Sequence, residues 1–453
     1  MFTSIRLKAE DFFTKGHERT LKAKKNIAIS LLLKGVNIVI GFILIPMTIS
    51  YVNTTQYGIW LTLSSVISWF SFFDVGLGLG LKNKLAETNA LGQKETAKIY
   101  ISTTYAALTL ISAIIFLTFY FLNNFLDWSK ILNANNTGIR GLSNLVLIVI
   151  GCFCIQFVVQ IINTVLTALH APSKVSFINA IGQLLCLIII YYLIKKTSGS
   201  LLNLVLVLAG IPLIVQLLAS TWLYNTSYKT FSPGIKYVNF KYAKKLLSLG
   251  GIFFILQIGA LVLFQTDNIV ITQLFGPKEV TTFNVTYKLF GVFEMIFTII
   301  MTPFWSAFTD AFTKKDFVWI KETFVTMQKY LFILSLIIVL LLAISPFVYR
   351  LWLHDKVQVP FSLSLVVSIY IILLCWMTLN CFLLNGIGKI RLQLYLYLVS
   401  TLINIPIAIF LGKVIGLIGV PLSNSLVLIF MASILHIQCK KIINNSATGI
   451  WNK

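Results

Sequence analysis

The chain has 453 residues, of which 58% are hydrophobic and only 11% are charged. Because soluble domains carry about 25% charged residues, this composition excludes a soluble enzyme, a disordered protein and a secreted disulfide scaffold, and it predicts a protein whose solvent is the lipid bilayer. A net charge of +22 would suggest a nucleic-acid partner for a soluble protein. In a membrane protein the same charge first indicates orientation, so we expect no nucleic-acid partner.

Apolar runs of roughly 20 residues predict about twelve transmembrane helices. Their expected limits, in chain order, are 26–51, 57–81, 99–122, 142–169, 175–194, 200–224, 246–274, 280–307, 324–349, 360–386, 392–412 and 416–438. The pattern therefore predicts an all-α polytopic membrane protein. The first span is too long for a signal peptide and has no cleavage site of the usual kind, so we expect it to remain as a helix.

A polar stretch in the middle of the chain divides the spans into two sets of six. The turn Leu169–Val175 in the first set resembles Leu384–Ile390 in the second. Two similar lobes favour an alternating-access transporter with its site between them, although a duplication without transport is also consistent. The expected organisation is a basic cytoplasmic tail (1–25), an N-lobe (26–224), a cytoplasmic linker (225–245), a C-lobe (246–440) and a cytoplasmic tail (441–453).

The positive charges predict the orientation of the spans. With the N-terminus inside, the segments expected in the cytoplasm hold 25 of the 36 Lys and Arg residues, and the loops on the other side hold 8. Cytoplasmic loops of membrane proteins carry an excess of basic residues. We therefore expect both termini to lie in the cytoplasm.

Five ionisable residues lie inside the expected spans, where a charged side chain is energetically unfavourable unless it pairs with an opposite charge or contacts water. Helical rise places Lys34 and Asp74 at a similar depth in one hairpin, and Asp267 and Lys288 at a similar depth in another. Each pair is either a salt bridge that fixes helix rotation or a set of charges that contact substrate or a coupling ion. Glu294 lies near the midplane without a partner close in sequence, which favours a role in titration or cation binding.

Three amide side chains, Gln156, Gln160 and Asn163, follow one another at helical spacing in the fourth span. They are candidates for contacts with sugar hydroxyls, and hydrogen bonds between helices explain them equally well. None of the six cysteines has a histidine at ligand spacing, so we expect no metal site.

A membrane enzyme is the competing class of function, for example a polysaccharide polymerase or ligase. Such enzymes generally need a sizeable polar loop outside the membrane. Here the longest outer loop, 123–141, has only Asp127, Lys130 and Arg140 as charged residues. We therefore expect no catalytic residues and a protein that is not an enzyme.

Two segments resemble a known transporter family. The run from Tyr57 to Glu87, which contains a Gly-Leu-Gly-Leu-Gly sequence at 76–80, is similar to the second helix of Wzx-type polysaccharide-biosynthesis flippases. Gln265–Ile271 in the seventh span and the Gly388-Lys389 turn before the eleventh are also similar to that family. These O-antigen and capsule transporters belong to the multidrug/oligosaccharidyl-lipid/polysaccharide (MOP) superfamily, which also contains the MATE exporters.

The resemblance implies two six-helix lobes in a V around a central cavity. It implies movement of undecaprenyl-pyrophosphate-linked oligosaccharide from the inner to the outer leaflet of a bacterial inner membrane by alternating access. The resemblance also implies possible coupling to an H⁺ or Na⁺ gradient without a bound cofactor. The expected partners are the lipid-linked oligosaccharide, membrane lipid and other polysaccharide assembly proteins, and we expect a monomer.

Charge separates the flippase from a MATE-like exporter of drugs or small solutes. An exporter of cations needs carboxylates in the cavity of its first lobe to bind its substrates, whereas this chain has Lys34 in the first span. A lysine is a good point-charge partner for a pyrophosphate. Neutralisation of Lys34 by Asp74 would weaken this argument, so the exporter remains the alternative.

Overall fold

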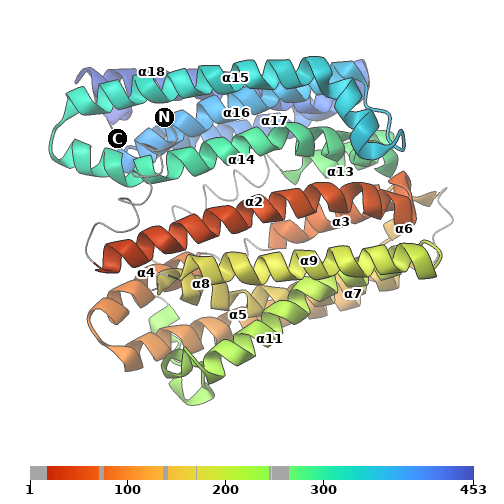
Figure 1. The fold of residues 1–453 in the computed structure, drawn as a ribbon, viewed down its shortest axis with the longest axis horizontal. Helices are drawn as coiled ribbons and strands as arrows, with labels where there is room; N and C mark the ends of the chain where they lie inside the picture. The colour runs from red at the N-terminus through yellow and green to blue at the C-terminus, as the bar shows by residue number, and fades with distance from the viewer. Residues whose placement is uncertain are drawn as a thin grey trace, which may run out of the picture. The chain divides into compact units, whose positions relative to one another are not determined.

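The computed structural model describes residues 18–70, 76–135, 141–169, 171–243, 246 and 265–452. In these ranges every regular element is a helix, as Figure 1 shows. Nine helical segments of the described chain are long and apolar enough to cross a membrane, and the last of them, Arg391–Ile443, contains two predicted spans. The prediction of an all-α polytopic membrane protein is confirmed.

Two predicted spans are absent from those nine segments for identifiable reasons. The second span is described as two shorter helices, α3 (Thr54–Phe70) and α4 (Leu77–Ala90), on either side of residues 71–75. Most of the seventh span lies outside the described residues, and the structure begins again near α13 (Asp267–Phe275). Asp74 also lies outside the described residues.

The chain forms two compact units. Unit 1 comprises residues 1–53, 70–128 and 139–254, and unit 2 comprises 54–69, 129–138 and 255–453. The sequence division placed 54–69 and 129–138 in the N-lobe, whereas the contacts place both segments in unit 2. Duplicated spans predict which helices follow one another in the chain, but they do not predict which helix a given face packs against.

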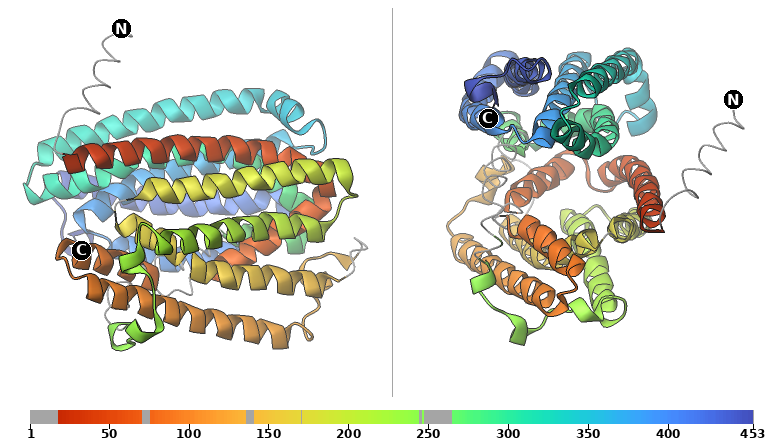
Figure 2. Two further views of the ribbon diagram at one scale, coloured as in Figure 1. Left: turned by 60° about the horizontal axis from the view of Figure 1, so that its bottom comes forward. Right: turned by 90° about the vertical axis from the view of Figure 1, so that its left-hand side faces the viewer.

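Unit 1 is a bundle in which α2 lies along α9, and α5 lies against α4 and α7 (Figures 1 and 2). Its helices, in chain order, are α2 (Glu18–Val52), α4, α5 (Lys94–Leu122), α7 (Leu142–Val159), α8 (Ile161–Ala168), α9 (Pro172–Lys196), α10 (Leu201–Val205), the π-helix η3 (Leu206–Gly210), α11 (Ile211–Asn225), and the 3₁₀ turns η4 (Lys229–Phe231) and η5 (Ile235–Tyr237). A core of buried Leu, Ile, Val, Phe and Tyr side chains joins α4, α5, α7 and α8.

Unit 2 is built around α16, which packs against α14, α15 and α18. Its helices are α3, α13, α14 (Pro277–Thr313), α15 (Phe317–Leu353), α16 (Phe361–Ile387), α17 (Arg391–Ile415) and α18 (Gly419–Ile443), and the 3₁₀ turns η6 (Gly416–Ile418) and η7 (Gly449–Asn452) follow α17 and α18. The short helix α6 (Trp128–Ile131) begins at Trp128, which belongs to unit 1, and continues into residues 129–138, which belong to unit 2.

Close backbone contact fixes α3 within unit 2. A Cβ atom added to Gly58 would overlap the carbonyl oxygen of Pro277 at the start of α14, so only glycine fits there. One turn away in the interface, the hydroxyl of Thr281 donates to the carbonyl oxygen of Thr54 at 2.6 Å. The glycine allows the two helices to approach closely, which is the usual role of small residues in membrane interfaces.

The fourth and sixth spans are interrupted rather than continuous. In the sixth, Pro212 follows η3; because proline has no N–H and its ring clashes with the preceding turn, the regular ladder gives way there to a widened π turn. In the fourth, α7 ends and α8 begins around Gln160, where the N–H of Asn163 bonds to the Gln160 carbonyl in a tighter i to i+3 pattern. The predicted fourth span, 142–169, is confirmed as the helical segment Leu142–Ala168, and the break at Gln160 lies within it.

Candidate substrate pocket and buried polar cluster

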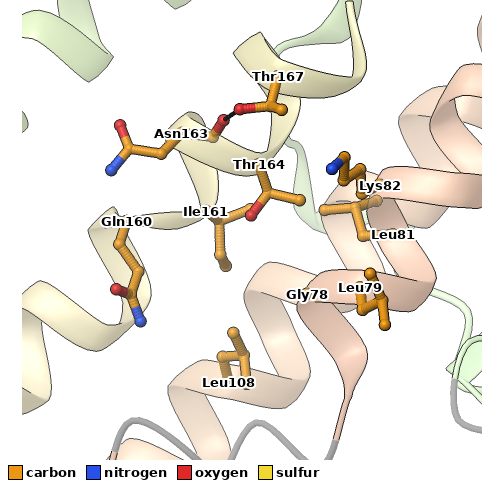
Figure 3. A pocket seen from close by; sticks show the side chains of 10 residues that line it. All are labelled: Gly78, Leu79, Leu81, Lys82, Leu108, Gln160, Ile161, Asn163, Thr164 and Thr167. Carbon is orange, nitrogen blue, oxygen red and sulfur yellow. Dashed lines mark hydrogen bonds between the residues drawn. The ribbon is translucent and has the colours of Figure 1, made fainter. Parts of the chain in front are cut away.

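The break in the fourth span lies beside a cavity of about 390 Å³ in unit 1. We call this cavity the unit 1 pocket. Figure 3 shows α4 forming one wall and the residues from the break and α8 forming the other. The lining residues are Gly78, Leu79, Leu81, Lys82, Leu108, Gln160, Ile161, Asn163, Thr164 and Thr167. Interrupted membrane helices often form substrate sites because their irregular backbone faces a cavity.

Two of the three predicted amide residues, Gln160 and Asn163, line this pocket. The Asn163 side-chain oxygen is buried and accepts no hydrogen bond from any residue that the structure describes. The hydroxyl of Thr167 donates instead to the backbone carbonyl of Asn163 at 2.7 Å, the dashed line in Figure 3. A buried acceptor without a donor is uncommon and marks a place where a ligand or water hydrogen-bonds.

Gln156, the third amide, has a different environment. Its amide nitrogen donates to the side-chain oxygen of Gln216 on α11, and Gln216 is buried. Gln156 is not part of the pocket lining. For this residue the alternative of a hydrogen bond between helices describes the contact that is present.

Lys82 supplies the positive charge of the pocket, and the sequence reasoning did not select it. It lies at the end of the apolar run of the second span, where a basic residue ordinarily indicates only the orientation of the span. Its neighbour Lys84 has a partner, because its ammonium group forms a 2.7 Å ion pair with Glu87. That hydrogen bond to Glu87 raises the pKa of Lys84. A basic residue on the same helix as the glycine run was the signal that could have identified Lys82.

Lys34 is exposed on α2 and is not among the residues that line the unit 1 pocket. Its predicted partner Asp74 lies outside the described residues, so their pairing stays a prediction. The use of Lys34 as a pyrophosphate contact also stays a prediction.

Unit 2 contains a buried polar cluster around Asp267. The first residue of α13 is only 4% exposed, and its carboxylate accepts a 2.7 Å hydrogen bond from the amide of Asn424 on α18. Asn424 in turn accepts a 2.7 Å bond from the amide of Asn404 on α17. The chain Asn404–Asn424–Asp267 joins three helices, and we call it the asparagine–aspartate cluster.

Asp267 and Lys288 do not pair, so the salt-bridge interpretation of their matched depth is wrong. Both residues are described, and no ion pair joins them. The physical reason is rotation about the helix axis. Asn268 faces α14 and accepts a 2.6 Å bond from Asn284, and successive helical side chains point about 100° apart. Asp267 instead accepts its hydrogen bond from Asn424 on α18.

Glu294 has a local partner that the sequence reasoning did not find. Its carboxylate accepts a 2.9 Å hydrogen bond from the hydroxyl of Thr298, one turn later in α14. Glu294 and Lys288 are both half-buried. Their proposed contact with substrate or a coupling ion stays a prediction.

Polar but uncharged residues, which the sequence analysis did not predict, also connect α3 to α13. The hydroxyls of Thr62 and Thr272 lie 2.6 Å apart, and the amide of Asn268 donates to Ser65 at 2.5 Å. We call these four residues the α3–α13 interface. The signal in the sequence was the repetition of hydroxyl side chains three residues apart in the first half of the second span.

The sequence matches the family described as polysaccharide biosynthesis protein over residues 23–307 and the family described as MatE over residues 254–410. It is 27% identical over 263 residues to a Salmonella typhi protein named as an O-antigen transporter, a match that covers 55% of this chain and 56% of that protein. It is 23% identical over 367 residues to a Yersinia pseudotuberculosis protein named as an O-antigen export protein, covering 79% and 81% of the two chains. The chain thus spans little more than half the length of the first relative.

Solved structures show the same fold. An inward-facing multidrug resistance MATE family transporter of the MOP superfamily superposes with a TM-score of 0.70 at 15% identity, covering 94% of this chain and 98% of the other. An outward-facing structure with the same description gives 0.65 at 14% identity, covering 94% and 97%. Because the first family match extends over more than half of the chain, the protein belongs to the polysaccharide biosynthesis protein family.

Proposed function

We propose that this protein is a transporter that moves a lipid-linked oligosaccharide from the inner to the outer leaflet of a bacterial inner membrane. The cargo would be an O-antigen, capsule or exopolysaccharide repeat unit on undecaprenyl pyrophosphate. The family match and the names of two relatives support this proposal. The structural observation that carries it is the unit 1 pocket, whose lining brings the polar residues Gln160, Asn163 and Thr164 together with a lysine, Lys82.

The chemistry of the unit 1 pocket suits a phosphorylated sugar. The amides of Gln160 and Asn163 and the hydroxyl of Thr164 offer donors and acceptors to sugar hydroxyls. Lys82 offers a point charge to a phosphate oxygen. A pocket of this kind gains more from a hydroxyl-rich ligand than from an apolar one, because Asn163 would otherwise stay unpaired.

The proposed topology places this pocket where the substrate is made. With both termini in the cytoplasm, Lys82 lies at the cytoplasmic end of the second span, and the pocket would receive the glycan from that side. Alternating access would then release it on the other side. We expect a monomer that contacts membrane lipid and works with other polysaccharide assembly proteins.

We further propose that Asp267 couples transport to a proton or sodium gradient. A carboxylate that is 4% exposed and has one hydrogen-bond donor is costly to keep charged. A proton or a small cation at Asp267 would remove most of that cost, and the oxygens of Asn404 and Asn424 lie in the same cluster. The cluster therefore has the chemistry of a coupling site that needs no bound cofactor.

The alternative function is a cation-coupled exporter of drugs or small solutes, which the MatE match over residues 254–410 favours. The matched region lies in unit 2 apart from its first residue, so it concerns the helices around the asparagine–aspartate cluster. The polysaccharide match includes the unit 1 pocket. The pocket thus supports the flippase over the exporter.

Transport by the purified protein tests the proposal. The full chain is reconstituted in liposomes with a fluorescent undecaprenyl-pyrophosphate oligosaccharide, and a membrane-impermeant quencher reports how much lipid reaches the outer leaflet. We expect gradient-dependent flipping that falls about tenfold in Asn163→Leu and is retained in Lys84→Gln, whose lysine is already paired with Glu87. Absence of flipping together with gradient-driven efflux of a cationic dye would overturn the flippase in favour of the exporter.

A further inference from the structure

The segment that follows α11, residues 226–243, is fastened to the side of α5 in unit 1. The backbone N–H of Gly234 donates to the hydroxyl of Ser102 at 3.1 Å, and the N–H of Asn239 donates to Thr103 at 3.0 Å. The ammonium group of Lys98 lies 4.4 Å from the ring centre of Tyr237, a cation–π contact. These contacts hold the segment in one position on α5.

Between this segment and α5 lies a groove of about 590 Å³. Most of its walls are apolar: α5 contributes Ala106, Leu110 and Ala113, and the segment contributes Ile235, Val238 and Phe240. Three of these side chains are largely uncovered, since Ile235 is 93% exposed, Leu110 59% and Phe240 57%. The groove is therefore open to the surroundings of the helix bundle, which in a membrane protein are lipid.

The groove has the length of one leaflet. It extends along α5 from Ser102 to Ala113, a rise of about 16 Å at 1.5 Å per residue. The hydrocarbon core of a bilayer is about 30 Å thick, so half of it is about 15 Å. One acyl chain lying along α5 would fill the groove from the polar boundary to the bilayer centre.

The segment that forms one wall of the groove is basic. Lys229, Lys236 and Lys241 are all exposed, and the segment 226–243 contains no Asp or Glu. The nearest acid along α5 is Glu95, in the first turn of that helix. Lysines at a membrane boundary attract anionic headgroups, and exposed apolar side chains beside them enter the interface.

We propose that the groove between α5 and residues 226–243 binds one acyl chain of an anionic phospholipid, and that Lys236 and Lys241 hold its headgroup. The site takes a lipid of the surrounding bilayer rather than the transported lipid. It is separate from the unit 1 pocket, with which it shares no lining residue. Binding would secure the segment that leads from unit 1 toward unit 2.

Native mass spectrometry of the detergent-purified full chain tests the site. The protein is titrated with palmitoyl-oleoyl phosphatidylglycerol and, separately, with the matching phosphatidylcholine. We expect the first phosphatidylglycerol to bind at least threefold more tightly than phosphatidylcholine. Ala106→Trp fills the groove and should remove this preference, whereas Ile114→Trp, exposed on the same helix but outside the groove, should retain it.

Charge variants provide a second measurement that does not alter the groove. Lys236→Gln with Lys241→Gln should weaken phosphatidylglycerol binding at least threefold, and the matched pair Lys195→Gln with Lys196→Gln at the end of α9 should leave it unchanged. Equal binding of both phospholipids, or equal effects of the two lysine pairs, would overturn the proposal. Undecaprenyl phosphate that displaces phosphatidylglycerol from the normal protein but not from Ala106→Trp would assign the groove to the transported lipid instead.

Discussion

Asn163 in unit 1 and Asn424 in unit 2 are both amide side chains inside membrane spans, but their hydrogen bonding differs. The side-chain oxygen of Asn163 is buried beside a cavity without a donor among the described residues. Asn424 is 2% exposed, donates to Asp267 and accepts from Asn404. A fully bonded amide stabilises one arrangement of helices, whereas an unbonded one gains a partner only when a ligand arrives.

This difference separates two roles that the same residue type performs in one chain. In unit 1 the side-chain oxygen of Asn163, next to a break in a helix, has no hydrogen-bond donor among the described residues, which suits a residue that binds a ligand only during part of the transport cycle. The asparagine–aspartate cluster of unit 2 uses its hydrogen-bonding capacity between helices, around the buried carboxylate of Asp267. The following variants test whether recognition and coupling are divided in this way.

The largest effect is expected for Asp267→Asn. The amide keeps the size of the side chain and accepts the bond from Asn424, but it takes up neither a proton nor a cation. Gradient-driven flipping should fall about a hundredfold, within the range of typical coupling free energies of about 1–3 kcal/mol, while the melting temperature in detergent stays near that of the normal protein. Undiminished gradient-driven flipping would remove Asp267 from the coupling mechanism.

Asn424→Leu should reduce stability more than any change in the unit 1 pocket. It leaves Asp267 without its donor and Asn404 without its acceptor, and each lost buried partner costs about 1–3 kcal/mol. Thermal unfolding in detergent should therefore show a clear drop in melting temperature. A melting temperature equal to that of the normal protein would mean that the cluster contributes no stability.

Asn163→Leu should reduce transport without reducing stability, the reverse of what we expect for Asn424→Leu. The leucine removes a buried acceptor that has no partner, so the melting temperature should hold or rise slightly. Flipping of the oligosaccharide lipid should fall about tenfold, equivalent to roughly 1.4 kcal/mol of lost binding. A fall in stability with normal flipping would contradict the assignment of Asn163 to substrate.

The smallest effect is expected for Lys82→Gln. An exposed lysine contributes modest electrostatic attraction, so we expect a loss of about threefold in flipping, mainly through weaker binding of the pyrophosphate, and a greater loss at low salt than at high salt. Lys84→Gln on the same helix is the control, because Lys84 is paired with Glu87. Equal losses in both variants would indicate a general effect of surface charge.

The architecture was predictable because long apolar runs leave a chain few alternatives. Ten of the twelve expected spans correspond to described helices. The break at Gln160 was not predictable, since no proline lies in that run, its glycine, Gly151, is more than two turns away, and only the β-branched neighbours weaken the helix near Gln160. Interrupted spans thus depend on packing as well as on local sequence.

Site residues were predictable where an unusual residue type stood out in an apolar span. They were not predictable where the rotation of a helix about its axis determines which neighbour a side chain contacts. Gln160 and Asn163 were found because amides are rare in an apolar span. Helical rise predicted a common depth for Asp267 and Lys288, but depth does not determine which neighbouring helix a side chain faces. Asn404 and Asn424 lie on different helices, so no local spacing in the sequence indicates that they belong to one cluster with Asp267.

The membership of α3 in unit 2 has a consequence for biosynthesis. Thr62 and its partner Thr272 are separated by 210 residues, which a ribosome translates in roughly 10–40 s at about 5–20 residues per second. During that interval the hydroxyl face of α3 lies in the membrane before α13 has been made. Nascent chains released before residue 267 therefore lack the partner helix that α3 needs, and we expect quality-control proteases to recognise them through this span.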